Sequence, residues 1–288
     1  MNKTTNHFLL IRFALFIFVL LWAQIGRALS DEEILQKQGE LQGKPVGERI
    51  AFWTESFVGT PYDKDPQGEY VTKATIVADE RVDCMYLTFR AVELALSKTP
   101  EEAIQIALDK RFQSRGILRE GRVINYEDRF DYGEDMIPSG KWGRDVSAEI
   151  GRTVRIKGSR GRDFYEILPP REIKRGLDKL KSGDIVFFMT RPEKRKVNEA
   201  VGHIGIIKVE RNSALEEIYL IHASGSKNKG GLVKKVLLQD YISRMPFVGV
   251  IVTRFEEKKT GKMEGPKTGT VEEWKIGIMG WEGREDES

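Results

Sequence analysis

The spacing of apolar residues predicts helices in the first part of the chain. Between residues 31 and 58 the pattern fits one or two helices, and the second has a stripe of large apolar side chains. Another helix is predicted to begin at Cys84, because the apolar residues after it lie three or four positions apart and Asp83 is a suitable N-cap. Thr99 and Pro100 mark the start of a further helix, as a cap followed by a proline in the first turn.

From Lys181 onward the pattern changes to short apolar runs typical of strands. A buried strand is predicted at residues 185–189. Further strand candidates follow at hairpin-like spacing, at residues 203–209, 218–223, 232–238 and 247–253. Helices followed by a meander of strands favour an α+β fold with an antiparallel sheet over a doubly wound parallel one. Residues 116–171 show only short strand candidates, such as 153–156, and we expect loops there that form one wall of a cleft.

Residues 1–30 have the pattern of a secretory signal peptide. Basic residues precede an almost uninterrupted apolar run from Phe13 to Ala23, and small residues follow, so cleavage is predicted before Asp31. The alternative is an uncleaved signal anchor, since the apolar stretch counted from Phe8 is nearly long enough to span a bilayer. We therefore expect a periplasmic or secreted protein, with no stable membrane insertion after cleavage.

The charge balance excludes one class of partner. The whole chain has 47 Lys and Arg against 44 Asp and Glu, and three of the basic residues but none of the acidic ones lie in residues 1–30. The remainder therefore carries 44 residues of each sign, which gives no case for nucleic-acid binding. It is long enough for one sizeable domain, predicted at residues 31–255 and followed by a charged tail at residues 256–288.

Cysteine and histidine are scarce, and their positions suggest chemistry. Cys84 is the only cysteine, and after the first 30 residues the only histidines are His203 and His222. A helix N-terminus favours a thiolate, which can act as a nucleophile if one imidazole is its base and a further polar group orients that imidazole. Alternatively, Cys84 is a small buried hydrophobe and the histidines are hydrogen-bonded core residues. A zinc site made from all three side chains is a further alternative, although no closely spaced ligand pair is present.

Five short motifs follow one another along the chain: G-T-P-Y at residues 59–62, D-C at 83–84, L-K-S-G-D-I-V-F-F at 180–188, H-I-G-I at 203–206 and I-H-A-S at 221–224. Each is weak alone, but their order resembles the NlpC superfamily of papain-like cysteine peptidases and amidases of bacterial cell walls. The resemblance covers about residues 46–255. The chain is most similar to the muropeptide amidases that resemble N-acetylmuramoyl-L-alanine amidase, which share the long gap between the first two motifs and a segment like R-F-D-Y-G-E-D-M-I at residues 129–137.

The resemblance implies a papain-like fold, in which N-terminal helices carry the nucleophile at a helix N-terminus and pack on an antiparallel sheet or partial barrel. It implies Cys84 as nucleophile, His203 as base and His222 as the residue that orients the base. Tyr62 and Asp83 would line the pocket that binds the peptide part of the substrate.

The activity implied by the resemblance is hydrolysis of peptidoglycan fragments, or muropeptides, by a Cys-His-His amidase that needs no cofactor and no metal. The expected bond joins N-acetylmuramic acid to L-alanine. One alternative is an endopeptidase that cleaves after γ-D-glutamate with the same site. Another is a cell-wall binding module that has kept the fold without the chemistry.

Two departures from the superfamily pattern concern the site. Met85 stands after the cysteine, where members commonly have a small residue, and is expected to narrow or reshape the site beside the thiol. The two histidines are nineteen residues apart, farther than is typical. We expect Arg211–Glu217 to form an extended hairpin loop that accounts for this spacing.

Overall fold

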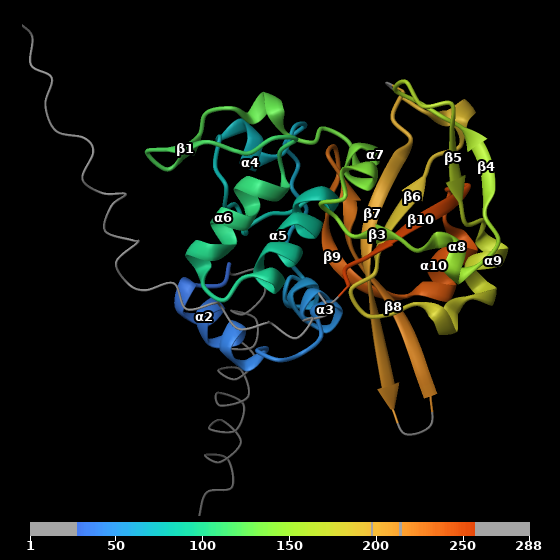
Figure 1. Ribbon diagram of the computed structural model, residues 1–288, viewed down its shortest axis with the longest axis horizontal. Helices are drawn as coiled ribbons and strands as arrows, with labels where there is room; N and C mark the ends of the chain where they lie inside the picture. Colours follow the sequence, from blue (N-terminus) through green and yellow to red (C-terminus); the bar gives the residue numbers. More distant parts are fainter. Residues whose placement is uncertain (1–27, 197, 213–214, 257–288) are drawn as a thin grey trace, which may run out of the picture. The chain divides into compact units, whose positions relative to one another are not determined.

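The computed structural model describes residues 28–196, 198–212 and 215–256, and within them helices come first and a large sheet follows (Figure 1). The predicted signal peptide (residues 1–30) and charged tail (residues 256–288) lie almost wholly outside this part of the chain. In the part that is described, no helix is long and apolar enough to cross a membrane. The order of elements confirms the predicted α+β class.

The helices that precede the sheet pack around one buried helix, α5. They are α2 (Asp31–Glu40), α3 (Val46–Ser56), α4 (Glu69–Thr72), α5 (Cys84–Leu96) and α6 (Pro100–Lys110). The Thr99 hydroxyl accepts a hydrogen bond from the Glu102 N–H and so begins α6, as predicted. α5 is buried from Tyr86 to Ala95, because α3, α6 and strands of the sheet all contact it.

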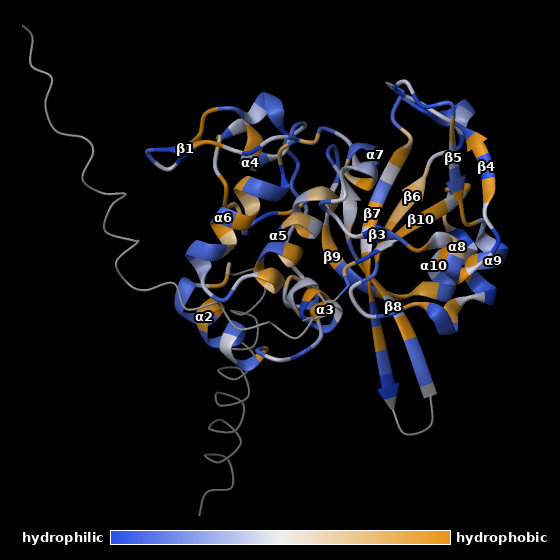
Figure 2. Cartoon of the chain, in the orientation of Figure 1, coloured by the Kyte–Doolittle hydropathy of each residue, from blue (hydrophilic) through white to orange (hydrophobic). Residues whose placement is uncertain are grey.

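The main sheet is antiparallel, with the strand order β3-β10-β6-β7-β8-β9. Its strands are β3 (Arg144–Asp145), β6 (Ile185–Met189), β7 (Val201–Asn212), β8 (Leu215–Ser226), β9 (Gly230–Leu237) and β10 (Gly249–Arg254). Phe187 and Ile204 belong to the core shared with α3 and α5, whereas Phe188 and Leu220 belong to a second core shared with α9 (Pro170–Arg175) and α10 (Leu238–Arg244). The sheet is therefore covered on both faces, and Figure 2 shows apolar residues along its strands.

Residues 116–171 are less regular but contain more structure than loops alone. β1 (Leu118–Arg119) pairs with β2 (Arg122–Val123), and β4 (Val154–Lys157) pairs with β5 (Phe164–Ile167). The other short elements of this segment are α7 (Gly133–Met136), α8 (Ser147–Ile150) and the 3-10 helices η1 (Tyr126–Asp128) and η2 (Ile137–Ser139), and two further 3-10 helices follow it, η3 (Leu177–Lys179) and η4 (Pro192–Lys194). The strand predicted near residues 153–156 is confirmed as β4.

Strand length, not a loop, explains the long spacing between the histidines. β7 and β8 remain paired as far as Asn212 opposite Leu215. The hairpin loop predicted for Arg211–Glu217 is therefore wrong, because most of this segment lies within the two strands. An ion pair between Arg211 and Glu216, with Nε and Oε2 3.0 Å apart, supports the pairing across the extended ribbon.

Ion pairs are buried within the helical core. Both carboxylate oxygens of Glu93 in α5 accept hydrogen bonds from Arg111, each at 2.6 Å, and neither side chain is more than 1% exposed. Arg90 in the same helix donates to Asp79 at 2.9 Å. Removing one member of such a pair leaves an unpaired buried charge, so these contacts fix the position of α5.

Candidate active site

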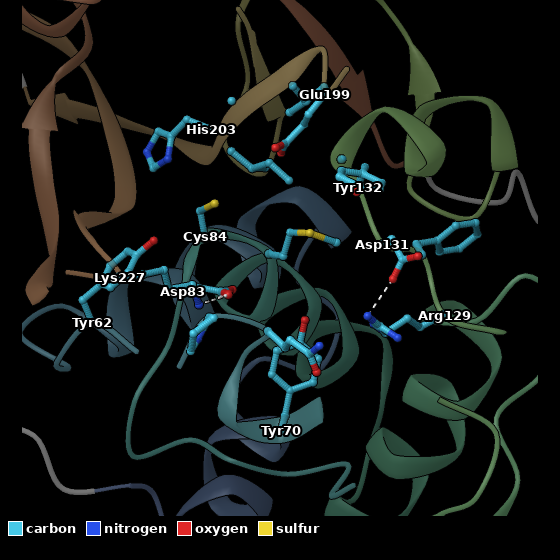
Figure 3. Close-up of a pocket in the computed structure, with 18 residues that line it drawn as sticks. Tyr62, Tyr70, Asp83, Cys84, Arg129, Asp131, Tyr132, Glu199, His203 and Lys227 are labelled. Carbon is cyan, nitrogen blue, oxygen red and sulfur yellow. Dashed lines mark hydrogen bonds and ion pairs between the residues drawn. The ribbon is translucent and has the colours of Figure 1, made fainter. Parts of the chain in front are cut away.

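A cavity of about 460 Å³ lies where the start of α5 faces the start of β7 (Figure 3). Tyr62, Asp83, Cys84 and His203 line it, whereas His222 is 5% exposed and lies outside the lining. The segment from residue 129 to residue 133 forms one wall, which confirms the cleft wall predicted for this region. Met85 also lines the cavity, as its position beside Cys84 predicts. Four of the five predicted site residues therefore line one cavity, and the fifth, His222, is hydrogen-bonded to His203.

Cys84 is the first residue of α5, as the sequence predicts. Asp83 has an extended backbone, and its Oδ1 accepts a hydrogen bond from the Tyr86 N–H at 2.8 Å, which begins the helix. Its Oδ2 accepts from Lys227 Nζ at 3.0 Å. The cap holds the thiol at a helix N-terminus, where unpaired backbone N–H groups concentrate positive potential.

Burial decides the ionisation of the Cys84 thiol. Burial, followed by the negative charge of Asp83, raises the pKa of Cys84 to about 12. The backbone N–H of Ile204 and the ammonium of Lys227 lower this pKa but do not offset the burial. The expected thiolate is therefore not the form that this site favours at neutral pH, and the thiol keeps its proton.

His203 and His222 lie on neighbouring strands, and their side chains meet. His203 Nε2 and His222 Nδ1 are 2.7 Å apart, so one imidazole donates a hydrogen bond to the other. A neutral imidazole carries one proton, so donation from His203 Nε2 leaves His203 Nδ1 free to accept a proton. This is the arrangement that a base and its orienting residue require, and the two roles stay predictions.

Both imidazoles are held in the neutral form by their surroundings. Burial, with a smaller contribution from His222, lowers the pKa of His203 to about 3. Burial and the charge of Lys234 lower the pKa of His222 to about 4. The Phe247 ring stacks on His203 at 6.3 Å between centroids, and the Tyr241 ring lies edge-on to His222 at 5.0 Å. These rings replace water and so disfavour the charged imidazolium.

The Cys84 thiol and the His203 imidazole share the cavity without a direct hydrogen bond. In the part of the chain that is described, no hydrogen bond joins the Cys84 thiol to His203, although both side chains line the same space (Figure 3). Catalytic hydrogen bonds of this kind commonly form only in the complex with substrate. The geometry is therefore compatible with proton transfer once a substrate occupies the cavity.

Two glycines, one within the first histidine motif and one directly after the second, leave room for the site. A Cβ on Gly205 would lie 2.6 Å from a methyl carbon of Leu220 and 3.2 Å from the Cβ of His222. A Cβ on Gly225 would lie 2.5 Å from the Tyr62 ring. A side chain at either position would displace a residue of the candidate site, which explains the glycine in H-I-G-I.

The G-T-P-Y motif forms a strap, which we define as residues 59–63, between the sheet and the helices. The N–H groups of Gly59 and Tyr62 donate to carbonyls of β9 at 3.0 and 2.8 Å. On the other side of the strap, the Val82 N–H donates to the carbonyl of Pro61 at 3.0 Å. The strap therefore joins β9 to the residues that lead into α5, and it places the Tyr62 ring in the cavity.

Sequence reasoning did not single out three residues near Cys84 and the two histidines. Lys227 and Glu199 line the cavity, and Tyr241 lies against the histidine pair. A lysine in a turn and a glutamate in a loop have the pattern of solvated surface residues, and a tyrosine in a short helix that of a core residue. Only the tertiary structure reveals their positions, so no local signal could have identified them.

The geometry does not support the zinc alternative. Among the residues that are described, no group of three or more His, Cys, Asp or Glu side chains is arranged to hold a metal ion. His203 Nε2 and His222 Nδ1 face each other at hydrogen-bond distance, so these two nitrogens are not turned toward a shared metal ion.

No protein-family model and no curated protein matches the chain, but solved structures resemble it. An N-acetylmuramoyl-L-alanine amidase from Bacteroides uniformis is 19% identical with a TM-score of 0.55, over 74% of this chain and 99% of that chain. A Legionella pneumophila protein of family DUF1460 is 14% identical with a TM-score of 0.58, over 77% of this chain and 93% of that chain. At these identities the likeness establishes a shared α+β fold, and membership of the NlpC superfamily stays a prediction.

Proposed function

We propose that this protein is an exported cysteine amidase that hydrolyses peptidoglycan fragments between N-acetylmuramic acid and L-alanine. The proposal rests on one cavity that is lined by a cysteine at a helix N-terminus and by His203, whose imidazole is hydrogen-bonded to that of His222. The substrate is supported by the order of the five sequence motifs. It is also supported by the fold likeness to proteins named N-acetylmuramoyl-L-alanine amidases.

In the proposed reaction, His203 Nδ1 takes the proton of the Cys84 thiol while Sγ attacks the carbonyl carbon of the amide. Because burial raises the pKa of Cys84 and lowers that of His203, proton transfer accompanies the attack and does not precede it. His222 accepts the Nε2–H of His203, which fixes the tautomer and stabilises the imidazolium as it forms.

The tetrahedral oxyanion is stabilised by backbone N–H groups at the start of α5. The His203 imidazolium then gives its proton to the leaving nitrogen of L-alanine, and the C–N bond breaks to leave a thioester on Cys84. A water molecule, deprotonated by His203 Nδ1, attacks the thioester carbonyl. The C–S bond then breaks, His203 passes its proton to the Cys84 thiolate, and the lactyl carboxylic acid is released and loses its proton to solvent.

Tyr62 and Asp83 are proposed to act on the peptide part of the substrate in different ways. The Tyr62 ring lines the cavity and is positioned by the strap. Both oxygens of Asp83 already accept hydrogen bonds, one from the cap of α5 and one from Lys227. We therefore propose that Asp83 contributes by holding Lys227 at the cavity.

The test compares wild type with Cys84→Ala on purified muropeptides, with mass spectrometry of the products. Wild type should release free peptide and free amino sugar, whereas Cys84→Ala should release neither. Cleavage after γ-D-glutamate would instead support the endopeptidase alternative. Binding of muropeptides without turnover would support the alternative of a wall-binding module. Equal turnover by both proteins would exclude the cysteine mechanism. Inhibition by a chelator but not by a thiol alkylator would point to a metal enzyme.

The proposed roles of the histidines differ in how far turnover depends on them. His222→Ala should retain more residual activity than His203→Ala, because an orienting residue is less indispensable than a base. Circular dichroism checks that both variants are folded. If His203→Ala retained more activity than His222→Ala, His222 would be the base and His203 the orienting residue.

Export is tested separately by cell fractionation and N-terminal sequencing. The mature protein should be periplasmic or secreted and should begin at Asp31. A membrane-bound product that retains residues 1–30 would show that this segment is an uncleaved signal anchor.

A further inference from the structure

The charged residues that line the active-site cavity are paired, with one exception. Lys227 pairs with Asp83 at 3.0 Å, and Arg129 pairs with Asp131 at 2.7 Å. The remaining acidic or basic side chain of the lining is Glu199. The two ion pairs cancel, so Glu199 sets the net charge that a substrate meets in this cavity.

Glu199 precedes β7, and its carboxyl group points into the cavity (Figure 3). Within the described residues, no hydrogen bond or ion pair engages this carboxyl group; the backbone N–H of Glu199 donates to the Lys196 carbonyl at 3.1 Å. The nearby Glu134 is different, because its oxygens accept from the N–H groups of Ala200 and Val201 at 2.8 and 3.1 Å. Glu134 thus holds the backbone, whereas Glu199 is left to contact a substrate.

Burial and nearby charges bring the pKa of the Glu199 carboxyl group close to neutral pH. Burial, followed by the charge of Glu134, raises the pKa of Glu199 to about 7, and the Arg160 guanidinium lowers it. Arg160 lies 4.0 Å from the Tyr132 ring and 3.4 Å from an oxygen of Asp135, so it is not free to pair with Glu199. In turn, the charge of Glu199 raises the pKa of the Cys84 thiol.

We propose that Glu199 is a specificity-determining residue that binds a primary ammonium group on the peptide part of the substrate. A carboxylate without a partner in a partly enclosed cavity gains most from a cationic hydrogen-bond donor, and it repels a carboxylate or phosphate. Diamino acids of peptidoglycan peptides carry such an ammonium group. The identity of the substrate rests on the proposed amidase function.

This assignment links recognition to activation of the nucleophile. When an ammonium group neutralises Glu199, the repulsion between its carboxylate and a developing thiolate is removed. The thiol then becomes easier to deprotonate in the complex with the correct peptide. A peptide without the ammonium group loses both its contact with Glu199 and this effect on Cys84.

The test uses two muropeptides that contain lysine and differ only in acetylation of the lysine side-chain nitrogen. For wild type, acetylation should raise KM at least about tenfold, the factor expected for one charged hydrogen bond. Glu199→Gln should raise KM for the free amine by a similar factor and should barely distinguish the two substrates. Glu193→Gln, an exposed glutamate of the same connecting segment, is the matched control and should behave like wild type.

The pH dependence gives an independent readout that a purely structural role would not produce. KM of wild type for the free amine should fall as the pH rises from 6 to 8, because ammonium binds the ionised carboxylate. This fall should be absent in Glu199→Gln. The groups that face Glu199 and shape this profile are Glu134, Arg160 and Cys84.

The outcomes that overturn the proposal differ from those that overturn the amidase function. An equal KM of wild type for both muropeptides, or an equal acetylation penalty in Glu199→Gln, would show that Glu199 does not bind the ammonium group. If wild type has no turnover, calorimetry with Cys84→Ala still measures how much more tightly the muropeptide with the free lysine amine binds than the acetylated one. Binding of both with one affinity would then overturn the Glu199 assignment as well.

Discussion

His222 should make the stability of the fold sensitive to acid. His222 is buried and neutral in the folded protein, where its pKa is about 4, but its ordinary pKa is 6.5. Between these values the unfolded chain binds a proton that the folded protein does not. Stability is therefore lost as the pH falls from about 6.5 to about 4.

The magnitude follows from the two pKa values. At pH 5 the unfolded imidazole is almost fully protonated and the folded one is mostly neutral, which corresponds to a loss of about 2 kcal/mol in the free energy of unfolding. His222→Gln removes this titrating group together with its hydrogen bond to His203. The variant should be less stable than wild type at pH 7.5, and the difference should shrink by about 2 kcal/mol at pH 5.

The assay is denaturant unfolding of wild type and His222→Gln at pH 7.5, 6 and 5, followed by circular dichroism. Ile242→Val is a suitable control, because it removes one buried methyl group from α10 and adds no titrating group. Its deficit relative to wild type should not change with pH. A constant gap between wild type and His222→Gln over the same range would refute the reasoning, since it would mean that His222 titrates alike in both states.

Other consequences of the structure can be measured separately. Alkylation of Cys84 by iodoacetamide, followed by mass spectrometry, should be slow at pH 7 and should accelerate through pH 10, because burial raises the pKa of the thiol; a plateau near pH 8 would contradict this. Glu93→Gln should lower the free energy of unfolding by about 3–5 kcal/mol, since it leaves Arg111 charged and buried, and a denaturant curve like that of wild type would show that the pair is not needed. Gly205→Ala should cost about 1–3 kcal/mol and reduce turnover by displacing His222, whereas unchanged stability and turnover would mean that the strands absorb the methyl group.

The sequence was sufficient for those features that depend on local patterns. The start of α5 at Cys84 was predictable because an N-cap, a change of periodicity and an apolar helix face coincide there. The strands with buried faces were predictable for a similar reason. The pairing of the outer ends of β7 and β8 was not predictable. Their polar residues have the pattern of a loop until their cross-strand partners are known.

The chemistry of the candidate site was only partly predictable. The scarcity of cysteine and histidine pointed to Cys84, His203 and His222, and the fold brings the latter two into contact. The protonated state of the thiol was not predictable, because burial outweighs the local effect of the helix N-terminus. Glu199 was also out of reach, since its significance comes from the pairing of other cavity charges by residues distant in sequence.

The strap has a consequence for the order in which the chain can assemble. Residues 59–63 are synthesised early, but the β9 carbonyls that accept their hydrogen bonds belong to Gly231 and Val233, about 170 residues later. Contacts that are so distant in sequence form late, since a long loop must close first. The ring of Tyr62 therefore reaches its place only when β9 has joined the sheet. A nascent chain that ends before β9 would carry the thiol of Cys84 without a finished cavity around it.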